Sequence, residues 1–165
     1  MTKKIKILIV EDQTILAYGM KEVLEDMGYS VVGIAGKGSK AIALFEEKHP
    51  DIVLMDIEIK GDRNGIETSK DLLEIRKVPI IFITGSAADQ ELMKQAQIVD
   101  PYAILDKPFH RVNAENAISL ALYKFNKKEA LETEEPKETK ELYIWLEEGK
   151  GRNVKIYYKD ILWIQ

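Results

Sequence analysis

The sequence predicts an α/β protein with a doubly wound parallel sheet, followed by a short β-type tail. Two observations predict the sheet. Short runs rich in isoleucine and valine recur over residues 1–126, and longer stretches with apolar residues at three- and four-residue spacing separate them. A third observation separates the tail, because the segment after Phe125 is charged and interrupted by a proline. We therefore expect one full domain and a smaller appendage in this chain of 165 residues.

Five short runs are the expected strands. They are apolar almost throughout, as is typical of strands that helices cover on both faces. The runs are Ile5 to Val10, Ser30 to Ala35, Ile52 to Asp56, Ile80 to Thr84 and Tyr102 to Asp106.

The stretches between these runs carry apolar stripes at helical spacing, which predicts amphipathic helices. The stripe in the last stretch is the clearest, and it consists of Ala114, Ala117, Ile118, Ala121, Leu122 and Phe125.

The remaining residues divide into a linker and a tail. Residues 127–140 are charged and poor in apolar side chains, which predicts a solvated linker and allows a helical start. Residues 141–165 contain two β-type runs around a glycine-containing turn, which predicts a hairpin. An isolated hairpin is marginal in water, so we expect it to pack on something or to belong to a larger unit.

The composition excludes several classes of protein. The chain has no cysteine, which excludes disulfides, thiolate catalysis and cysteine-ligated metal centres. No apolar run is long enough to span a bilayer, and no signal-peptide pattern opens the sequence, so we expect a cytoplasmic protein without membrane contact. The net charge of -4 gives no general attraction to a nucleic-acid backbone.

Polar side chains lie at the carboxyl ends of four of the expected strands: Glu11 and Asp12, then Asp56, then Thr84, then Lys107. The carboxyl ends of parallel strands form the functional crevice of such a sheet. Three carboxylates brought together there would repel one another unless a cation neutralised them, and Mg²⁺ prefers oxygen ligands. With a lysine and a hydroxyl to hold an oxyanion, these are the parts of a phosphoryl-transfer site.

Each residue also has a simpler interpretation. Asp12 can cap the helix that begins near Thr14, Thr84 suits a strand end through its β propensity, and Lys107 begins a Lys-Pro turn. Their joint occurrence in this strand order favours the site. We expect His49 and His110 to face solvent rather than to bind metal or phosphate.

Residues 4–126 resemble the receiver domains of two-component response regulators. The motifs that carry the resemblance are Ile7-Leu8-Ile9-Val10-Glu11-Asp12, Pro50-Asp51-Ile52-Val53-Leu54-Met55-Asp56-Ile57, Ile81-Phe82-Ile83-Thr84-Gly85 and Lys107-Pro108-Phe109. The resemblance implies a five-stranded parallel sheet in the flavodoxin-like order 2-1-3-4-5 with helices on both faces. It also implies a cis peptide bond between Lys107 and Pro108.

The resemblance further implies that Asp56 is the phosphorylated residue. Asp12 would bind Mg²⁺ directly with Glu11 nearby, and the backbone carbonyl of Glu58 would complete the protein ligands.

The same resemblance implies that Lys107 pairs with the phosphoryl group and that Thr84 moves to bind it. The donor would be a phosphohistidine on a sensor histidine kinase, or a small molecule such as acetyl phosphate. The protein would then be a signalling module and not an enzyme. Its output would switch through the face formed by the fourth helix, fifth strand and fifth helix, which also offers a homodimer contact.

One position departs from the family pattern. Three residues before the lysine the family has a tyrosine or phenylalanine that turns inward on activation, and here that residue is Ile104. Tyr102 lies two residues earlier, and alternation along a strand predicts that it points to the same face as Ile104.

The tail resembles the opening strands of a LytTR-type DNA-binding domain, which would make the output transcriptional. The chain would then stop inside that domain, and DNA binding would require a full domain beyond residue 165. The alternative is a hairpin that packs on the receiver domain or on a neighbouring chain.

Two other functions share parts of this pattern. A haloacid-dehalogenase-like phosphohydrolase also uses an aspartate nucleophile with Mg²⁺, but it carries that aspartate after the first strand with a second one two residues later. Here Asp56 follows the third strand and Ile57-Glu58 follow it. A flavodoxin-like electron carrier needs a phosphate loop after the first strand, where Glu11 and Asp12 would repel phosphate.

Overall fold

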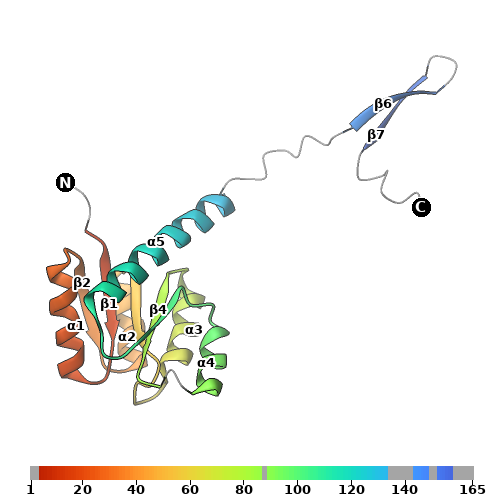
Figure 1. Cartoon of the computed structure of the whole chain (residues 1–165). Coiled ribbons are helices and arrows are strands. Elements are labelled where there is room, and N and C mark those ends of the chain that lie inside the picture. Colours follow the sequence, from red (N-terminus) through yellow and green to blue (C-terminus); the bar gives the residue numbers. More distant parts are fainter. Residues whose placement is uncertain (1–3, 87–88, 134–142, 149–151, 158–165) are drawn as a thin grey trace. The chain divides into compact units, whose positions relative to one another are not determined.

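The structure is a computed structural model that describes residues 4–86, 89–133, 143–148 and 152–157 (Figure 1). The chain divides into two compact units, residues 1–127 and residues 128–165, which we describe separately.

The first unit contains the predicted five-stranded sheet, and all neighbouring strands in it are parallel. Its strands stand in the order β2-β1-β3-β4-β5, which confirms the predicted order. They are β1 (Lys6–Val10), β2 (Ser30–Ala35), β3 (Ile52–Asp56), β4 (Ile80–Thr84) and β5 (Ala103–Asp106). Only β1 and β5 begin one residue later than the sequence predicts.

Helices cover both faces of this sheet. They are α1 (Thr14–Asp26), α2 (Gly38–Lys48), α3 (Gly65–Ile75), α4 (Gln90–Gln97) and α5 (Arg111–Thr133). Buried side chains of α2, α3 and α4 pack on one face, and those of α1 and α5 pack on the other. The sequence pattern of alternating strands and helices therefore predicts the fold class correctly.

Alternation along each central strand divides the core into two apolar layers. In β1, Leu8 and Val10 contribute to the layer under α2, α3 and α4, whereas Ile7 and Ile9 contribute to the layer under α1 and α5. Because both faces are covered, β3 and β4 are buried along their whole length. The edge strands β2 and β5 are only half-buried.

The predicted apolar stripe of α5 lies on its sheet-facing side. Ala114, Ala117, Ile118 and Ala121 are buried, and the polar residues between them, Glu115, Asn116 and Ser119, are exposed. The helix continues to Thr133, so the start of the predicted linker is helical. Among the helices that the structure describes, none is long and apolar enough to cross a membrane.

The second unit contains the predicted hairpin. Strands β6 (Tyr143–Glu148) and β7 (Arg152–Tyr157) pair antiparallel and form a two-stranded sheet. The further apolar run at residues 160–164, on which the LytTR resemblance partly depends, lies outside the described residues.

Candidate functional site

The carboxyl ends of β1 and β3 bring three acidic residues together. Strand β2 lies on one side of β1 and β3 lies on the other, so the order of the sheet reverses at β1 and a crevice opens at that point. Glu11 and Asp12 follow β1 directly, and Asp56 is the last residue of β3. One carboxylate oxygen from each residue lies within 4.8 Å of the others. The structure thus brings together the acidic cluster that the sequence predicts.

Asp56 is 3% exposed, and both of its carboxylate oxygens have partners. Oδ1 accepts a hydrogen bond from the backbone N–H of Glu58 at 3.1 Å, and Oδ2 accepts one from Lys107 Nζ at 2.8 Å. These two contacts hold the carboxylate in one orientation at the end of a fully buried strand.

Lys107 is the only cation that contacts the cluster among the described residues. Its Nζ lies 2.7 Å from Glu11 Oε2 as well as 2.8 Å from Asp56 Oδ2. The backbone N–H of Lys107 donates to the carbonyl of Thr84 at 2.8 Å, which anchors the lysine to the end of β4. The peptide bond between Lys107 and Pro108 is cis, as the resemblance implies.

The acidic cluster changes the ionisation of two groups. Burial raises the pKa of Glu11 above its usual value, although the neighbouring Lys107 and the N–H of Gln13 act in the opposite direction. Burial alone would lower the pKa of Lys107, but its hydrogen bonds to Asp56 and Glu11 outweigh this effect and the pKa of Lys107 is raised. Lys107 contacts two of the three clustered carboxylates, those of Glu11 and Asp56. The cluster therefore remains short of positive charge.

The space beside the carboxylates is large enough for a small anion and its metal ion. A cavity of about 280 Å³ opens there, and its lining residues are Asp12, Gln13, Asp56, Glu58, Lys60, Gly85 and Lys107. Three of its seven lining residues, Asp12, Asp56 and Glu58, carry carboxylates, whose oxygens are the donors that a hard cation such as Mg²⁺ prefers. The residues present therefore fit this metal.

Thr84 lies at the predicted strand end, but its side chain does not line this cavity. The residue is fully buried, and its Oγ1 accepts a hydrogen bond from the N–H of Ser86 at 3.0 Å. The simpler interpretation of Asp12 is wrong, because the N-cap of α1 is Gln13 and not Asp12. His49 and His110 are exposed, as the sequence predicts.

The prediction for Tyr102 is wrong. Ile104 packs against the layer under α2, α3 and α4, whereas Tyr102 packs against the opposite layer, with its ring edge-on to Phe125 at 6.0 Å. Strand β5 begins only at Ala103, so the strict alternation of a strand does not extend to Tyr102. Tyr102 consequently cannot replace the aromatic side chain that is missing at position 104.

Sequence analysis missed five residues that shape the site. Gln13, Lys60 and Gly85 line the cavity, and Ser86 contacts both Thr84 and Glu58. Gly65 begins α3 directly behind the carbonyl of Asp56. Gly65 carried a sequence signal, since it follows Asn64 at a helix start, but its contact with Asp56 depends on the tertiary fold.

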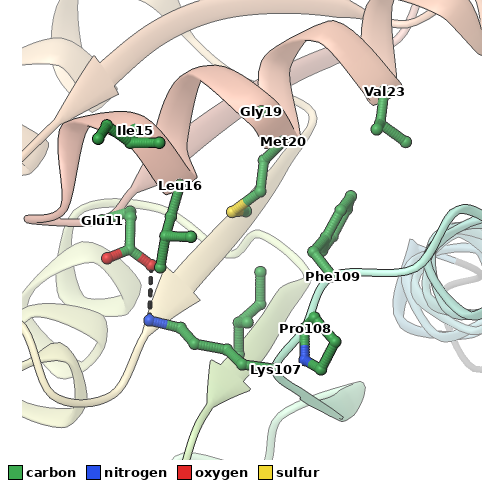
Figure 2. Close-up of a pocket in the computed structure, with 10 residues that line it drawn as sticks. Glu11, Ile15, Leu16, Gly19, Met20, Val23, Lys107, Pro108 and Phe109 are labelled. Carbon is green, nitrogen blue, oxygen red and sulfur yellow. Dashed lines mark ion pairs between the residues drawn. The ribbon is translucent and has the colours of Figure 1, made fainter.

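A second hollow lies on the other side of Lys107. This apolar groove has a volume of about 300 Å³, and its lining residues are Glu11, Ile15, Leu16, Gly19, Met20, Val23, Ile83, Lys107, Pro108 and Phe109. Figure 2 shows side chains of α1 facing Pro108 and Phe109 across the groove, with the ion pair of Glu11 and Lys107 at one end. Two of the lining residues, Ile15 and Leu16, are exposed to solvent.

Comparison with known proteins gives one family match. Residues 7–119 match the response regulator receiver domain. The transcriptional regulatory protein PdtaR of Mycobacterium tuberculosis is 34% identical over 129 residues, which cover 78% of this chain and 62% of PdtaR. The phyllosphere-induced regulator PhyR of Methylorubrum extorquens is 33% identical over 119 residues, which cover 72% of this chain and 43% of PhyR. The matched region thus spans less than two thirds of either relative.

Solved structures show the same likeness. The signal receiver domain of a modulated diguanylate cyclase from Desulfovibrio desulfuricans superposes with a TM-score of 0.73 at 34% identity, covering 76% of this chain and 99% of that domain. A CheY-like receiver domain protein from Methanospirillum hungatei superposes with a TM-score of 0.70 at 26% identity, with the same coverage.

Proposed function

Because the chain belongs to the response regulator receiver family of two-component signalling, we propose that it accepts a phosphoryl group on Asp56 and passes on the resulting conformational change. The observation that carries this proposal is the position of Asp56. Its carboxylate is almost fully buried at the end of β3, next to two further carboxylates and within hydrogen-bond distance of Lys107.

In the proposed reaction, a carboxylate oxygen of Asp56 forms a bond to phosphorus while the bond from phosphorus to its donor breaks. With a phosphohistidine donor, the electron pair of the broken bond remains on the imidazole nitrogen. Glu58 holds one oxygen of Asp56 through its N–H, which leaves the orientation of the carboxylate fixed before the donor arrives.

Mg²⁺ is the cofactor that this arrangement supports. Glu11, Asp12 and Asp56, with the backbone carbonyl of Glu58, would hold it, and its charge would neutralise the carboxylates and the incoming phosphoryl oxygens.

Lys107 and Thr84 are the proposed partners of the transferred group. Lys107 Nζ already contacts Asp56, so its ammonium group lies close enough to contact an oxygen of a phosphoryl group bound there. Thr84 is buried outside the cavity, so its hydroxyl has to move to reach a phosphoryl oxygen. That displacement of the end of β4 would be the first step of the response.

A sensor histidine kinase is the proposed donor, and the apolar groove between α1 and Phe109 is its proposed docking surface. The groove ends at Lys107, next to the phosphoacceptor. Exposed Ile15 and Leu16 extend its apolar surface along α1, and an apolar helix face of a partner would bury both.

The proposed output surface is the face of α4, β5 and α5, where phosphorylation would change the association of two copies. Ile104 on this face is smaller than the usual aromatic side chain, so we expect a smaller shift between the two conformations on phosphorylation. Sedimentation with and without beryllofluoride, a phosphoryl mimic, tests this proposal, and an unchanged association state would contradict it.

We further propose the division into a receiver domain (1–126), a charged linker (127–140) and a tail (141–165) that opens a LytTR-type domain. The resemblance of the tail supports a transcriptional output. Residues 1–165 alone have a net charge of -4 and offer few cations in the tail. We therefore expect no sequence-specific DNA binding by residues 1–165 in a gel-shift titration. Tight and selective binding would contradict this expectation and would show that the tail itself recognises DNA.

The experiment that tests the proposed function is incubation with acetyl phosphate in the presence and absence of Mg²⁺. The proposal predicts one Mg²⁺-dependent phosphoryl group per chain, stable to acid and labile to base. A phosphohydrolase of the haloacid-dehalogenase type would instead turn over a phosphomonoester such as p-nitrophenyl phosphate many times.

A further inference from the structure

One hydrogen bond links the two loops that border the phosphoacceptor cavity, and a second ties the same residue to the end of β4. Ser86 lies in the loop after β4, and its hydroxyl donates to Glu58 Oε2 in the loop after β3 at 2.7 Å. The backbone N–H of the same serine donates to Thr84 Oγ1 at 3.0 Å. Glu58 and Gly85, the residue next to Ser86, both line the cavity.

These contacts connect the side chain of Glu58 to the hydroxyl of Thr84 through one residue. Thr84 is fully buried and does not line the cavity, so in this structure its hydroxyl is held away from the phosphoacceptor by the N–H of Ser86. A movement of Thr84 into the cavity would shift Ser86, which is only two residues further along the chain. The bond between Ser86 and Glu58 opposes that shift, since Glu58 is anchored to Asp56 through its own N–H.

We propose that Ser86 is a positioning residue whose hydrogen bond to the Glu58 carboxylate holds Thr84 in its resting place and so lowers the population of the phosphoryl-binding conformation. This inference rests on the proposed function of Asp56. The bond stabilises only the resting conformation, because the active conformation requires the end of β4 to move. Its removal therefore shifts the equilibrium toward the active conformation.

The test is the affinity of three variants for beryllofluoride in the presence of Mg²⁺, measured by fluorine NMR. Ser86→Ala removes the hydroxyl, and we expect about a three- to tenfold gain in beryllofluoride affinity, the effect of losing one partly exposed hydrogen bond to a carboxylate. Ser86→Thr keeps a hydroxyl at the same place and should restore the wild-type affinity. The double variant Ser86→Ala, Glu58→Ala should gain no more than Ser86→Ala alone, since both substitutions remove the same bond.

Thermal unfolding of the variants separates positioning from a loss of fold. Ser86→Ala should unfold within a few degrees of the wild-type temperature, because an effect of about three- to tenfold is a small part of the stability of a domain. An unchanged or weaker affinity of Ser86→Ala would overturn the inference, as would a failure of Ser86→Thr to restore the wild-type value. If the wild-type protein itself fails to bind beryllofluoride, the proposed function of Asp56 fails, and that outcome is distinct from a failure of the Ser86 inference alone.

Discussion

Gly65 lies directly behind the carbonyl group of Asp56. A Cβ at position 65 would overlap the carbonyl oxygen of Asp56 and would stand 2.9 Å from its carbonyl carbon. The N–H of Gly65 also donates to the carbonyl of Ile57 at 2.9 Å. The first residue of α3 is therefore part of the wall that fixes Asp56, the proposed phosphoacceptor.

Gly65→Ala should displace Asp56, because the overlapping atoms belong to the backbone and cannot turn away. We expect a loss of about 1–3 kcal/mol in the free energy of unfolding, as in other overpacked sites, together with slower phosphorylation by acetyl phosphate. Denaturant unfolding and the rate of phosphoryl uptake measure the two effects.

Gly19→Ala is the matched control, since nothing lies within 4 Å of a Cβ at position 19 in α1. This substitution should stabilise the helix by about 0.5–1 kcal/mol. A Gly65→Ala variant that matched the control in stability and in phosphoryl uptake would contradict this prediction. It would show that the backbone near Asp56 can shift to admit a Cβ at little cost.

Gly19 also provides a test of the proposed kinase docking surface. Gly19→Leu should fill the groove without a clash inside the chain, because the position is exposed and open. We expect phosphotransfer from a histidine kinase that phosphorylates the wild-type protein to fall about tenfold, and uptake from acetyl phosphate to remain unchanged. Gly19→Ala should retain both activities. Equal transfer to the leucine and alanine variants would place the kinase elsewhere.

Lys107 would compete with the proposed metal ion for the same carboxylates, because its ammonium group contacts both Asp56 and Glu11. Lys107→Ala should therefore bind Mg²⁺ several-fold more tightly while losing the response to phosphorylation. Calorimetric titration with Mg²⁺ measures the first effect, and sedimentation with beryllofluoride measures the second. Lys107→Arg keeps the charge and serves as the control. Weaker Mg²⁺ binding by the alanine variant would contradict the proposed competition.

The raised pKa of Glu11 predicts how metal binding depends on pH. The proposed Mg²⁺ site requires Glu11 in its ionised form, so the affinity of the protein for Mg²⁺ should fall as the pH drops through the raised pKa of Glu11. This fall should occur at a higher pH than for an ordinary glutamate, whose pKa is near about 4.3. Without metal, protonated Glu11 favours the folded protein. This contribution to stability is present at low pH and is lost as the pH rises through the raised pKa.

Glu11→Gln should flatten this part of the pH profile of thermal stability measured without metal, and it should weaken the stabilisation by Mg²⁺ at neutral pH. A profile identical to that of the wild-type protein would show that another group titrates in this range.

The central sheet could be predicted because each strand is indicated by its own short stretch of sequence. Strands such as β3 and β4 are buried on both faces, so their apolar runs mark them with correct boundaries. The acidic cluster could be predicted for a related reason, since the carboxyl ends of parallel strands necessarily meet at one edge of the sheet.

Contacts between distant segments could not be predicted in this way. Tyr102, just before β5, contacts Phe125 in α5, and no alternation rule applies outside the strand. The bond between Ser86 and Glu58 depends on the path of two loops, and the clash behind Asp56 depends on where α3 begins. Each of these contacts depends on the tertiary fold, and the residue types of the two partners do not indicate it.

The most direct test of the central claim is the location of the phosphoryl group after incubation with acetyl phosphate and Mg²⁺. Reduction of the aspartyl phosphate with borohydride converts the phosphorylated residue to homoserine, which peptide mass spectrometry can place in the sequence. The account predicts homoserine at position 56 alone and no uptake by Asp56→Asn, because an amide does not attack phosphorus. Uptake by that variant at the wild-type level, or homoserine at another position, would contradict the account.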